Sequence, residues 1–153
     1  MPQSLVLEFP VEEQPAALEH LRSKLAAATD PSDVHADLEN GERGFLVVDA
    51  RSAEAYAREH VPGAISFPHR RMDAASTAAL PKDELIVVYC DGIGCNASTK
   101  AAFKLTALGF RVKEMLGGID WWKRDGYEVA TGVAAAEEHV HAQAAAVGPV
   151  CGC

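Results

Sequence analysis

Cys90 lies where a buried strand is expected to end and a glycine-punctuated loop to begin. The run over 87–98 reads Val-Val-Tyr-Cys-Asp-Gly-Ile-Gly-Cys-Asn-Ala-Ser. Ligands of open parallel sheets bind outside the carboxyl ends of the strands, so this position favours a functional cysteine. A lone cysteine at a strand end is more often a small buried core residue. This stretch alone leaves both interpretations open.

The loop after Cys90 could stabilise a negative charge. Its glycines allow the backbone to curl so that successive N–H groups face one point, and the following helix adds its N–H groups and positive dipole end. An anion formed there by Cys90 is a thiolate, whose pKa should fall from ~8.5 toward or below neutrality. If Cys90 lies inside this cradle, it is a nucleophile that needs no separate general base. The predicted substrate-binding residues are Asp91, Gly92, Ile93, Gly94, Cys95 and Asn96.

Short apolar runs over 45–48 and 85–89 are rich in β-branched residues and indicate buried parallel strands. Each is followed by helical sequence, the first capped by Ser52 and the second ending at Gly109. Strand and helix in alternation predict an α/β fold. Weaker candidates are strands over 64–67 and 110–113, and a short helix over 118–124.

Polar and aromatic residues near these elements are expected to be mainly structural. Asp49 and Arg51, at a strand end, should form buried hydrogen bonds or an ion pair that fixes the next loop. Trp121 and Trp122 cannot both face one way on a helix. One of them should pack into the core while the other walls a pocket.

The amino-terminal part of the chain predicts two helices. The first covers 15–28, where Leu18, Leu21 and Leu25 recur at spacings of three and four. The second has Asp30 as its N-cap and a proline at its first helical position, and it stops at Gly41.

Four blocks of the chain resemble the rhodanese family of single-domain sulfurtransferases. Two of them, Val-Asp-Ala-Arg-Ser-Ala-Glu-Ala-Tyr over 48–56 and His-Val-Pro-Gly-Ala-Ile over 60–65, are similar to that family's Asp-x-Arg, Glu-x-aromatic and His-x-x-Gly-Ala signature. Cys90 occupies the family's active-site position. The last block, Leu-Gly-Gly-Ile-Asp-Trp-Trp over 116–122 with Gly-Tyr-Glu-Val over 126–129, resembles its closing block. Related phosphatases have a loop one residue longer with an arginine, whereas position 96 is Asn.

The resemblance covers roughly residues 30–130 and implies a rhodanese-like α/β domain: a central parallel five-stranded sheet flanked by helices on both faces. It implies that Cys90 takes a sulfane sulfur from thiosulfate, polysulfide or a persulfide, becomes a persulfide itself, and passes the sulfur to a thiol or cyanide. A protein could also serve as the acceptor. No cofactor or metal is expected. Residues 1–29 are then an extension with a helix, and 131–153 an Ala-rich helix with a mobile Cys-Gly-Cys tail.

The loop departs from the family pattern in its charge. It lacks the arginine that holds an anionic donor in many relatives, and Asp91 places a negative charge beside the thiolate. Arg70 and Arg71 could reach the site from another loop, although adjacent exposed arginines are more often only solvated. These features predict a donor other than thiosulfate.

The additional cysteines leave other functions open. Cys95 could resolve a persulfide or sulfenic acid on Cys90, or could simply be a small residue that seats the following helix. Cys151 and Cys153 could accept sulfur, reduce Cys90, or bind a soft metal ion with nearby histidines, among them His139. A thiol/disulfide redox protein and a non-catalytic rhodanese-like binding module are therefore the alternatives to a sulfurtransferase.

Composition excludes some classes of partner. Lys and Arg number 14 against 22 Asp and Glu, a net charge of −8, and no basic run is present to bind nucleic acid or an anionic membrane. The amino terminus lacks a signal-like segment, and no stretch approaches ~18 apolar residues. We expect a cytoplasmic protein whose 4 cysteines stay reduced.

Overall fold

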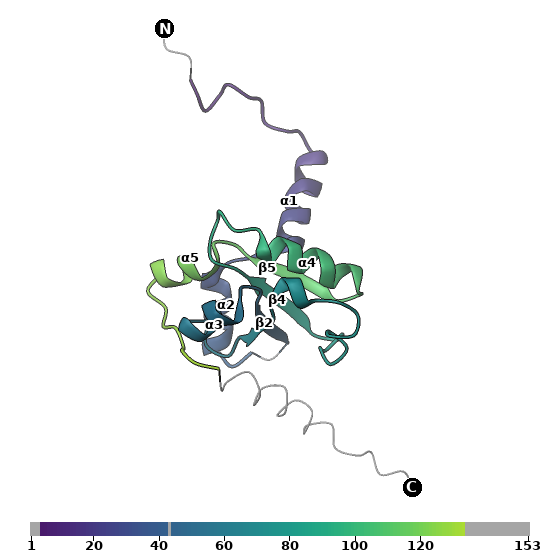
Figure 1. The fold of residues 1–153 in the computed structure, drawn as a ribbon. Helices are drawn as coiled ribbons and strands as arrows, with labels where there is room; N and C mark the ends of the chain where they lie inside the picture. The colour runs from purple at the N-terminus through teal and green to yellow at the C-terminus, as the bar shows by residue number, and fades with distance from the viewer. Residues whose placement is uncertain (1–3, 43, 134–153) are drawn as a thin grey trace.

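The computed structural model describes residues 4–42 and 44–133, which form a parallel sheet with helices on both sides (Figure 1). The strands lie in the order β1-β5-β4-β2-β3, and all neighbouring strands are parallel. They are β1 (Ala28–Thr29), β2 (Phe45–Asp49), β3 (Ile65–Ser66), β4 (Leu85–Tyr89) and β5 (Arg111–Met115). The helices are α1 (Ala16–Ala27), α2 (Pro31–Glu39), α3 (Ala53–Arg58), η1 (a 3-10 turn, His69–Arg71), α4 (Ala97–Ala107) and α5 (Gly118–Arg124). The predicted five-stranded α/β fold is confirmed.

Successive residues of the central strands enter two separate cores. Val48 of β2 packs in the same core as Leu105 of α4. Val47 points to the opposite face, into a core that contains Val34 of α2 and Trp122 of α5. Because both faces of β2 and β4 are covered, these strands are continuous apolar runs rather than alternating ones.

Local signals in the sequence set the ends of several helices. The Asp30 side chain accepts a hydrogen bond from the N–H of Asp33 at 2.9 Å, and Pro31 occupies the first helical position of α2. Ser52 caps α3 in the same way. Gly109 follows α4 with φ of +90°, a conformation that L side chains rarely adopt. These caps and stops agree with the sequence-based predictions.

Strand β1 is an element that the sequence pattern does not predict. The helix expected over 15–28 ends at Ala27, and Ala28 and Thr29 pair instead with Glu114 and Met115 of β5. A two-residue edge strand contains too few residues to show a periodic pattern, and its partner lies more than eighty residues away in the chain. Including Ala28 in the helix was therefore wrong.

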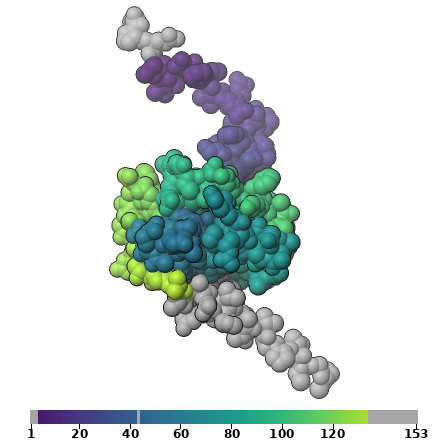
Figure 2. Space-filling view, viewed as in Figure 1, coloured from purple at the N-terminus to yellow at the C-terminus, as the bar shows by residue number. Residues whose placement is uncertain are grey.

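Helix α1 stands away from the body of the domain (Figures 1 and 2). The predicted helix is confirmed, but none of its residues is buried, and Leu18, Leu21 and Leu25 are all more than half exposed.

Within 4–42 and 44–133 no helix is long and apolar enough to span a bilayer. The predicted carboxy-terminal helix and Cys-Gly-Cys tail lie almost entirely outside the described residues.

A buried carboxylate joins the central strands at their carboxyl ends. Asp49, at the end of β2, is fully buried and accepts hydrogen bonds from Arg51 Nη2 at 2.7 Å and from the Tyr89 hydroxyl at 2.8 Å. The Tyr89 hydroxyl in turn accepts the N–H of Val61 at 3.0 Å, and Arg51 Nη2 donates to the carbonyl of Glu59 at 2.6 Å. The predicted structural role of Asp49 and Arg51 is confirmed by these contacts.

Replacing Arg51 by Met should lower the free energy of unfolding by about 3–5 kcal/mol, because it leaves the buried Asp49 carboxylate without its counter-ion. Tyr89→Phe should cost about 1–3 kcal/mol, since it removes one donor to that carboxylate and the acceptor of the Val61 N–H. Urea unfolding measures both changes. Arg70→Met, at an exposed position of η1, is the matched control and should stay within about 0.5 kcal/mol of wild type. A loss for Arg51→Met no larger than that of the control would contradict this account.

Candidate active site

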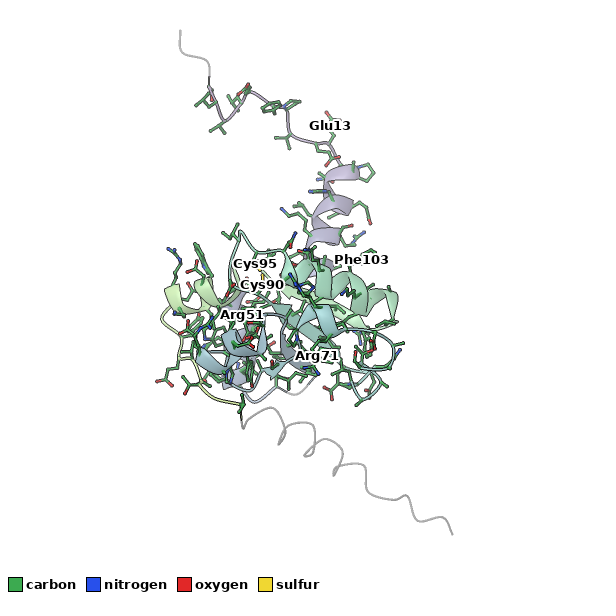
Figure 3. The ribbon with its side chains drawn as sticks, in the orientation of Figure 1. Glu13, Arg51, Arg71, Cys90, Cys95 and Phe103 are labelled. Carbon is green, nitrogen blue, oxygen red and sulfur yellow. The ribbon has the colours of Figure 1, made fainter. Side chains whose placement is uncertain are left out.

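Cys90 follows directly after β4 and is 2% exposed. It borders a cavity of about 520 Å³ at the carboxyl edge of the sheet, here called the sulfur cavity. Cys95, Ser98 and Glu114 also line this cavity, and Ile93 and Trp121 contribute apolar surface to it. Figure 3 shows Cys90 and Cys95 next to each other at this edge. The position of Cys90 at the carboxyl edge is the one expected for a ligand site of a parallel sheet.

Three oxygen atoms surround the Cys90 sulfur. Its thiol donates to the carbonyl of Cys95 at 3.1 Å, and the carbonyl of Gly92 lies at 3.9 Å. The Ser98 hydroxyl lies 3.4 Å from the sulfur and donates to Glu114 Oε2 at 3.0 Å. Ser98 of α4 thus lies between the Cys90 sulfur and the Glu114 carboxylate of β5.

Burial raises the pKa of Cys90 above that of an ordinary thiol, although the hydroxyl and the N–H of Ser98 act in the opposite direction. The predicted fall of this pKa toward neutrality is therefore wrong. The loop does curl, but it turns the Cys95 carbonyl toward the Cys90 sulfur, and a carbonyl favours the thiol over the thiolate. Of the backbone N–H groups that were expected to surround Cys90, only some point toward its sulfur, among them the N–H of Ser98.

The Cys95 sulfur receives the remaining N–H groups. Burial raises its pKa, but hydrogen bonds from the N–H of Ala97, from the thiol of Cys90 and from the N–H of Asp91 outweigh burial, so the net pKa is lowered. The carboxylate of Asp91 opposes this effect. Of the two thiols, Cys95 is therefore the one whose thiolate the loop favours.

Helix α5 holds the backbone of the loop from the other side. The N–H of Ile119 donates to the Cys90 carbonyl at 3.0 Å, and that of Asp120 donates to the Asp91 carbonyl at 2.8 Å. Gly118 has φ of +58°, and a Cβ added there would overlap the Cys90 carbonyl oxygen. Gly118, the first residue of α5, thus permits the close approach that fixes Cys90.

The other predicted loop residues occupy different surroundings. Asp91 is paired with Arg51 at 3.2 Å, with its side chain 71% exposed. Ile93 is 84% exposed at the rim of the sulfur cavity. Asn96 is exposed, precedes α4 without a capping side-chain bond, and borders neither hollow beside the loop. Gly92 lines the sulfur cavity and Gly94 does not. A substrate-binding role for residues 91–96 stays a prediction.

A larger hollow of about 970 Å³ adjoins the loop and is here called the outer hollow. Arg70 and Arg71 do not line it; they are exposed on η1, and Figure 3 places Arg71 away from the two cysteines. Its cations come from other elements and lie mostly in ion pairs with carboxylates. The pairs are Arg51 with Asp49 and Asp91, Lys123 with Glu59, and Arg124 with Asp120, while Arg58 has no partner among the described residues.

Both tryptophans behave as predicted. Trp122 is 1% exposed in the core, and its Nε1 donates to the Glu128 carbonyl at 2.8 Å. Trp121 is 44% exposed and lines both hollows. The residues that sequence reasoning missed are Ser98 and Glu114. The sequence did contain a signal for Glu114, because this residue follows the strand predicted over 110–113. The carboxyl end of that strand should lie at the same edge of the sheet as the carboxyl end of β4.

At pH 7, iodoacetamide should modify Cys95 faster than Cys90, because the thiolate is the reactive form and Cys95 is also more exposed. Sequencing of the tryptic peptide 83–100 by mass spectrometry separates the two sites. Ser98→Ala should slow the modification of Cys90 further by raising its pKa. Thr99→Val, which removes only the other hydroxyl bound to Glu114, is the control and should leave Cys90 unchanged. Faster modification of Cys90 than of Cys95 would be incompatible with these environments.

Comparisons with known proteins agree with this geometry. The model of the rhodanese-like domain matches residues 30–125. The chain is 33% identical over 73 residues to the thiosulfate sulfurtransferase PspE of Escherichia coli, covering 47% of this chain and 68% of that protein. It is 35% identical over 129 residues to the HTH-type transcriptional regulator Rv0324 of Mycobacterium tuberculosis, covering 78% of this chain but only 56% of the regulator.

A solved structure shows the same arrangement of strands and helices. The crystal structure of the BH2092 protein from Bacillus halodurans superposes with a TM-score of 0.76 at 43% identity, covering 78% of this chain and 87% of that one. With a family model that spans both β2 and the loop after β4, the chain belongs to the rhodanese-like domain family.

Proposed function

We propose that the protein is a sulfurtransferase that carries a sulfane sulfur on Cys90. The observation that supports this most directly is the position of Cys90, a free thiol at the carboxyl end of β4 that borders a cavity large enough for a small sulfur compound. The family supports the same class of activity, and one relative is named a thiosulfate sulfurtransferase. A reducing compartment such as the cytoplasm would keep Cys90 and Cys95 as free thiols.

The reaction has two displacement steps. The Cys90 thiolate attacks the outer sulfur of the donor, a new S–S bond forms, and the leaving group departs with the electron pair of the broken bond. A thiolate or cyanide acceptor then attacks the outer sulfur of the Cys90 persulfide and releases the Cys90 thiolate. When the Cys90 thiol turns from the Cys95 carbonyl to the Ser98 hydroxyl, its proton has a route through that hydroxyl to Glu114. This route matters because burial holds Cys90 in its thiol form.

The charges around the sulfur cavity favour a singly charged organic persulfide as the donor over a dianion such as thiosulfate. Asp30 and Glu114 line this cavity, and none of the described residues that line it is a lysine or arginine. Three of the four cations of the neighbouring outer hollow are paired with carboxylates. A doubly charged donor would therefore meet little compensating charge, whereas Ile93, Leu116 and Trp121 suit a donor with an apolar part.

Addition of one sulfur atom to Cys90 is the first expected result. The cleanest protein for this test is Cys95→Ser with Cys151 and Cys153 also replaced by Ser, because Cys90 is then the one thiol left of the 4 cysteines. After treatment with inorganic polysulfide and removal of the excess, its intact mass should rise by the mass of one sulfur atom on Cys90. The same protein with Cys90→Ala added is the matched control and should lack this addition. Equal sulfur uptake by both variants would show that Cys90 is not the carrier.

Introducing a cation at the rim should change the choice of donor. Ile93→Arg should increase the rate of sulfur loading from thiosulfate by about tenfold or more, since a charge-assisted hydrogen bond contributes about 1.5–3 kcal/mol. Ile93→Gln offers a long neutral side chain and should leave the thiosulfate rate near that of wild type. Wild-type protein should load faster from a singly charged alkyl persulfide than from thiosulfate. A wild-type rate with thiosulfate that matches the alkyl persulfide would contradict the proposed donor preference.

A further inference from the structure

Cys90 and Cys95 form a pair of thiols within one tight loop. Each thiol is a hydrogen-bond partner of the other, and the Cys95 carbonyl lies 3.1 Å from the Cys90 sulfur. Both residues are free cysteines, and both line the sulfur cavity. A turn in which the Cys95 N–H donates to the Gly92 carbonyl at 3.1 Å brings the ends of the loop together.

The surroundings of Cys95 are those of a reactive thiol rather than of a residue that only seats α4. Cys95 is half-buried and belongs to neither core of the domain. It borders both the sulfur cavity and the outer hollow, so a small reactant can approach it from either one. The N–H groups of Asp91 and Ala97 donate to its sulfur and favour the thiolate. This thiolate lies against the buried sulfur of Cys90.

From this arrangement we propose that Cys95 attacks the sulfur of Cys90 in the persulfide, so that the protein releases the bound sulfur as hydrosulfide and closes a Cys90–Cys95 disulfide. The inference rests on the proposed persulfide and adds a second activity, reductive release of sulfane sulfur, to simple transfer. It commits Cys95 to a chemical role that the resemblance to the family does not supply.

The step balances without a further reactant. The Cys95 thiolate forms a bond to the Cys90 sulfur, and the bond between that sulfur and the outer sulfur breaks. The electron pair of the broken bond leaves with the outer sulfur as HS⁻. The two cysteines are thereby oxidised to a disulfide and the sulfane sulfur is reduced to sulfide. An external dithiol, of low mass or on a protein, reduces the disulfide and restores both thiols.

The different surroundings of Cys90 and Cys95 determine which of the two cysteines attacks the other. The nucleophile is the cysteine whose thiolate the loop stabilises, and the sulfur that it attacks lies next to it in a buried position. Attack within the loop replaces an encounter with an external thiol, and such intramolecular reactions are strongly favoured when the reacting groups are held close together in one loop. An acceptor in the sulfur cavity must therefore compete with Cys95 for the Cys90 persulfide.

The test uses the full chain with Cys151 and Cys153 replaced by Ser, so that of its 4 cysteines only Cys90 and Cys95 remain. This protein is loaded with one equivalent of polysulfide and followed by intact mass and by a sulfide assay. The added sulfur should disappear as one hydrosulfide per chain is released, leaving a protein lighter by two hydrogens than the dithiol. In the same background, Cys95→Ser and Cys95→Ala should keep the added sulfur at least about tenfold longer.

The outcomes separate this inference from the proposed function. Sulfur that persists equally in the two-cysteine protein and in Cys95→Ser would overturn the role of Cys95 while leaving the Cys90 persulfide intact. Absence of added sulfur in every variant, Cys95→Ser included, would overturn the proposed function itself. Diamide, an oxidant that contains no sulfur, shows separately that the pair can close: it should form the disulfide without releasing sulfide. A pair that diamide fails to close would also overturn the inference.

Discussion

The buried carboxylate of Asp49 is the constraint on which the active edge of the sheet depends. A charge with no exposure to water requires strong partners, and here Arg51 and the Tyr89 hydroxyl supply them. Tyr89 is the residue directly before Cys90, and Arg51 also reaches Asp91 on the other side of that cysteine. Satisfying one buried charge therefore fixes the strand end that presents the nucleophile and the first residue of its loop.

A second restraint acts on the same short stretch from α5. Its first N–H groups hold the carbonyls of Cys90 and Asp91, and Gly118 leaves room for them to approach. Cys90 is thus held from β2, through Asp49, and from α5, while Ser98 of α4 contacts its sulfur. These supports leave the side chain of Cys95 at the mouth of the loop, between two hollows, where it is free to react.

Sequence reasoning predicted the parts of this arrangement that follow from local patterns. The strands around Asp49 and Tyr89 are short apolar runs, and parallel strands bring their carboxyl ends to one edge, so the place of Cys90 could be predicted. The burial of Cys90 depends on the elements packed around the strand end, which local patterns do not show, and the predicted pKa of Cys90 was wrong mainly because burial raises it. Ser98 and Glu114 come from separate elements, and their meeting depends on the strand order.

The loop holds two thiols in different environments: Cys90 is buried, and hydrogen bonds favour the thiolate of Cys95. The central claim is that Cys90 carries the sulfane sulfur that the protein transfers. The most direct measurement loads the Cys95→Ala and Cys90→Ala chains, each with Cys151 and Cys153 replaced by Ser, with an isotopically labelled sulfane donor, and then counts the labelled thiocyanate that each chain releases to cyanide. The account predicts that Cys95→Ala transfers the label and that Cys90→Ala does not. Equal transfer of label by the two chains would contradict it.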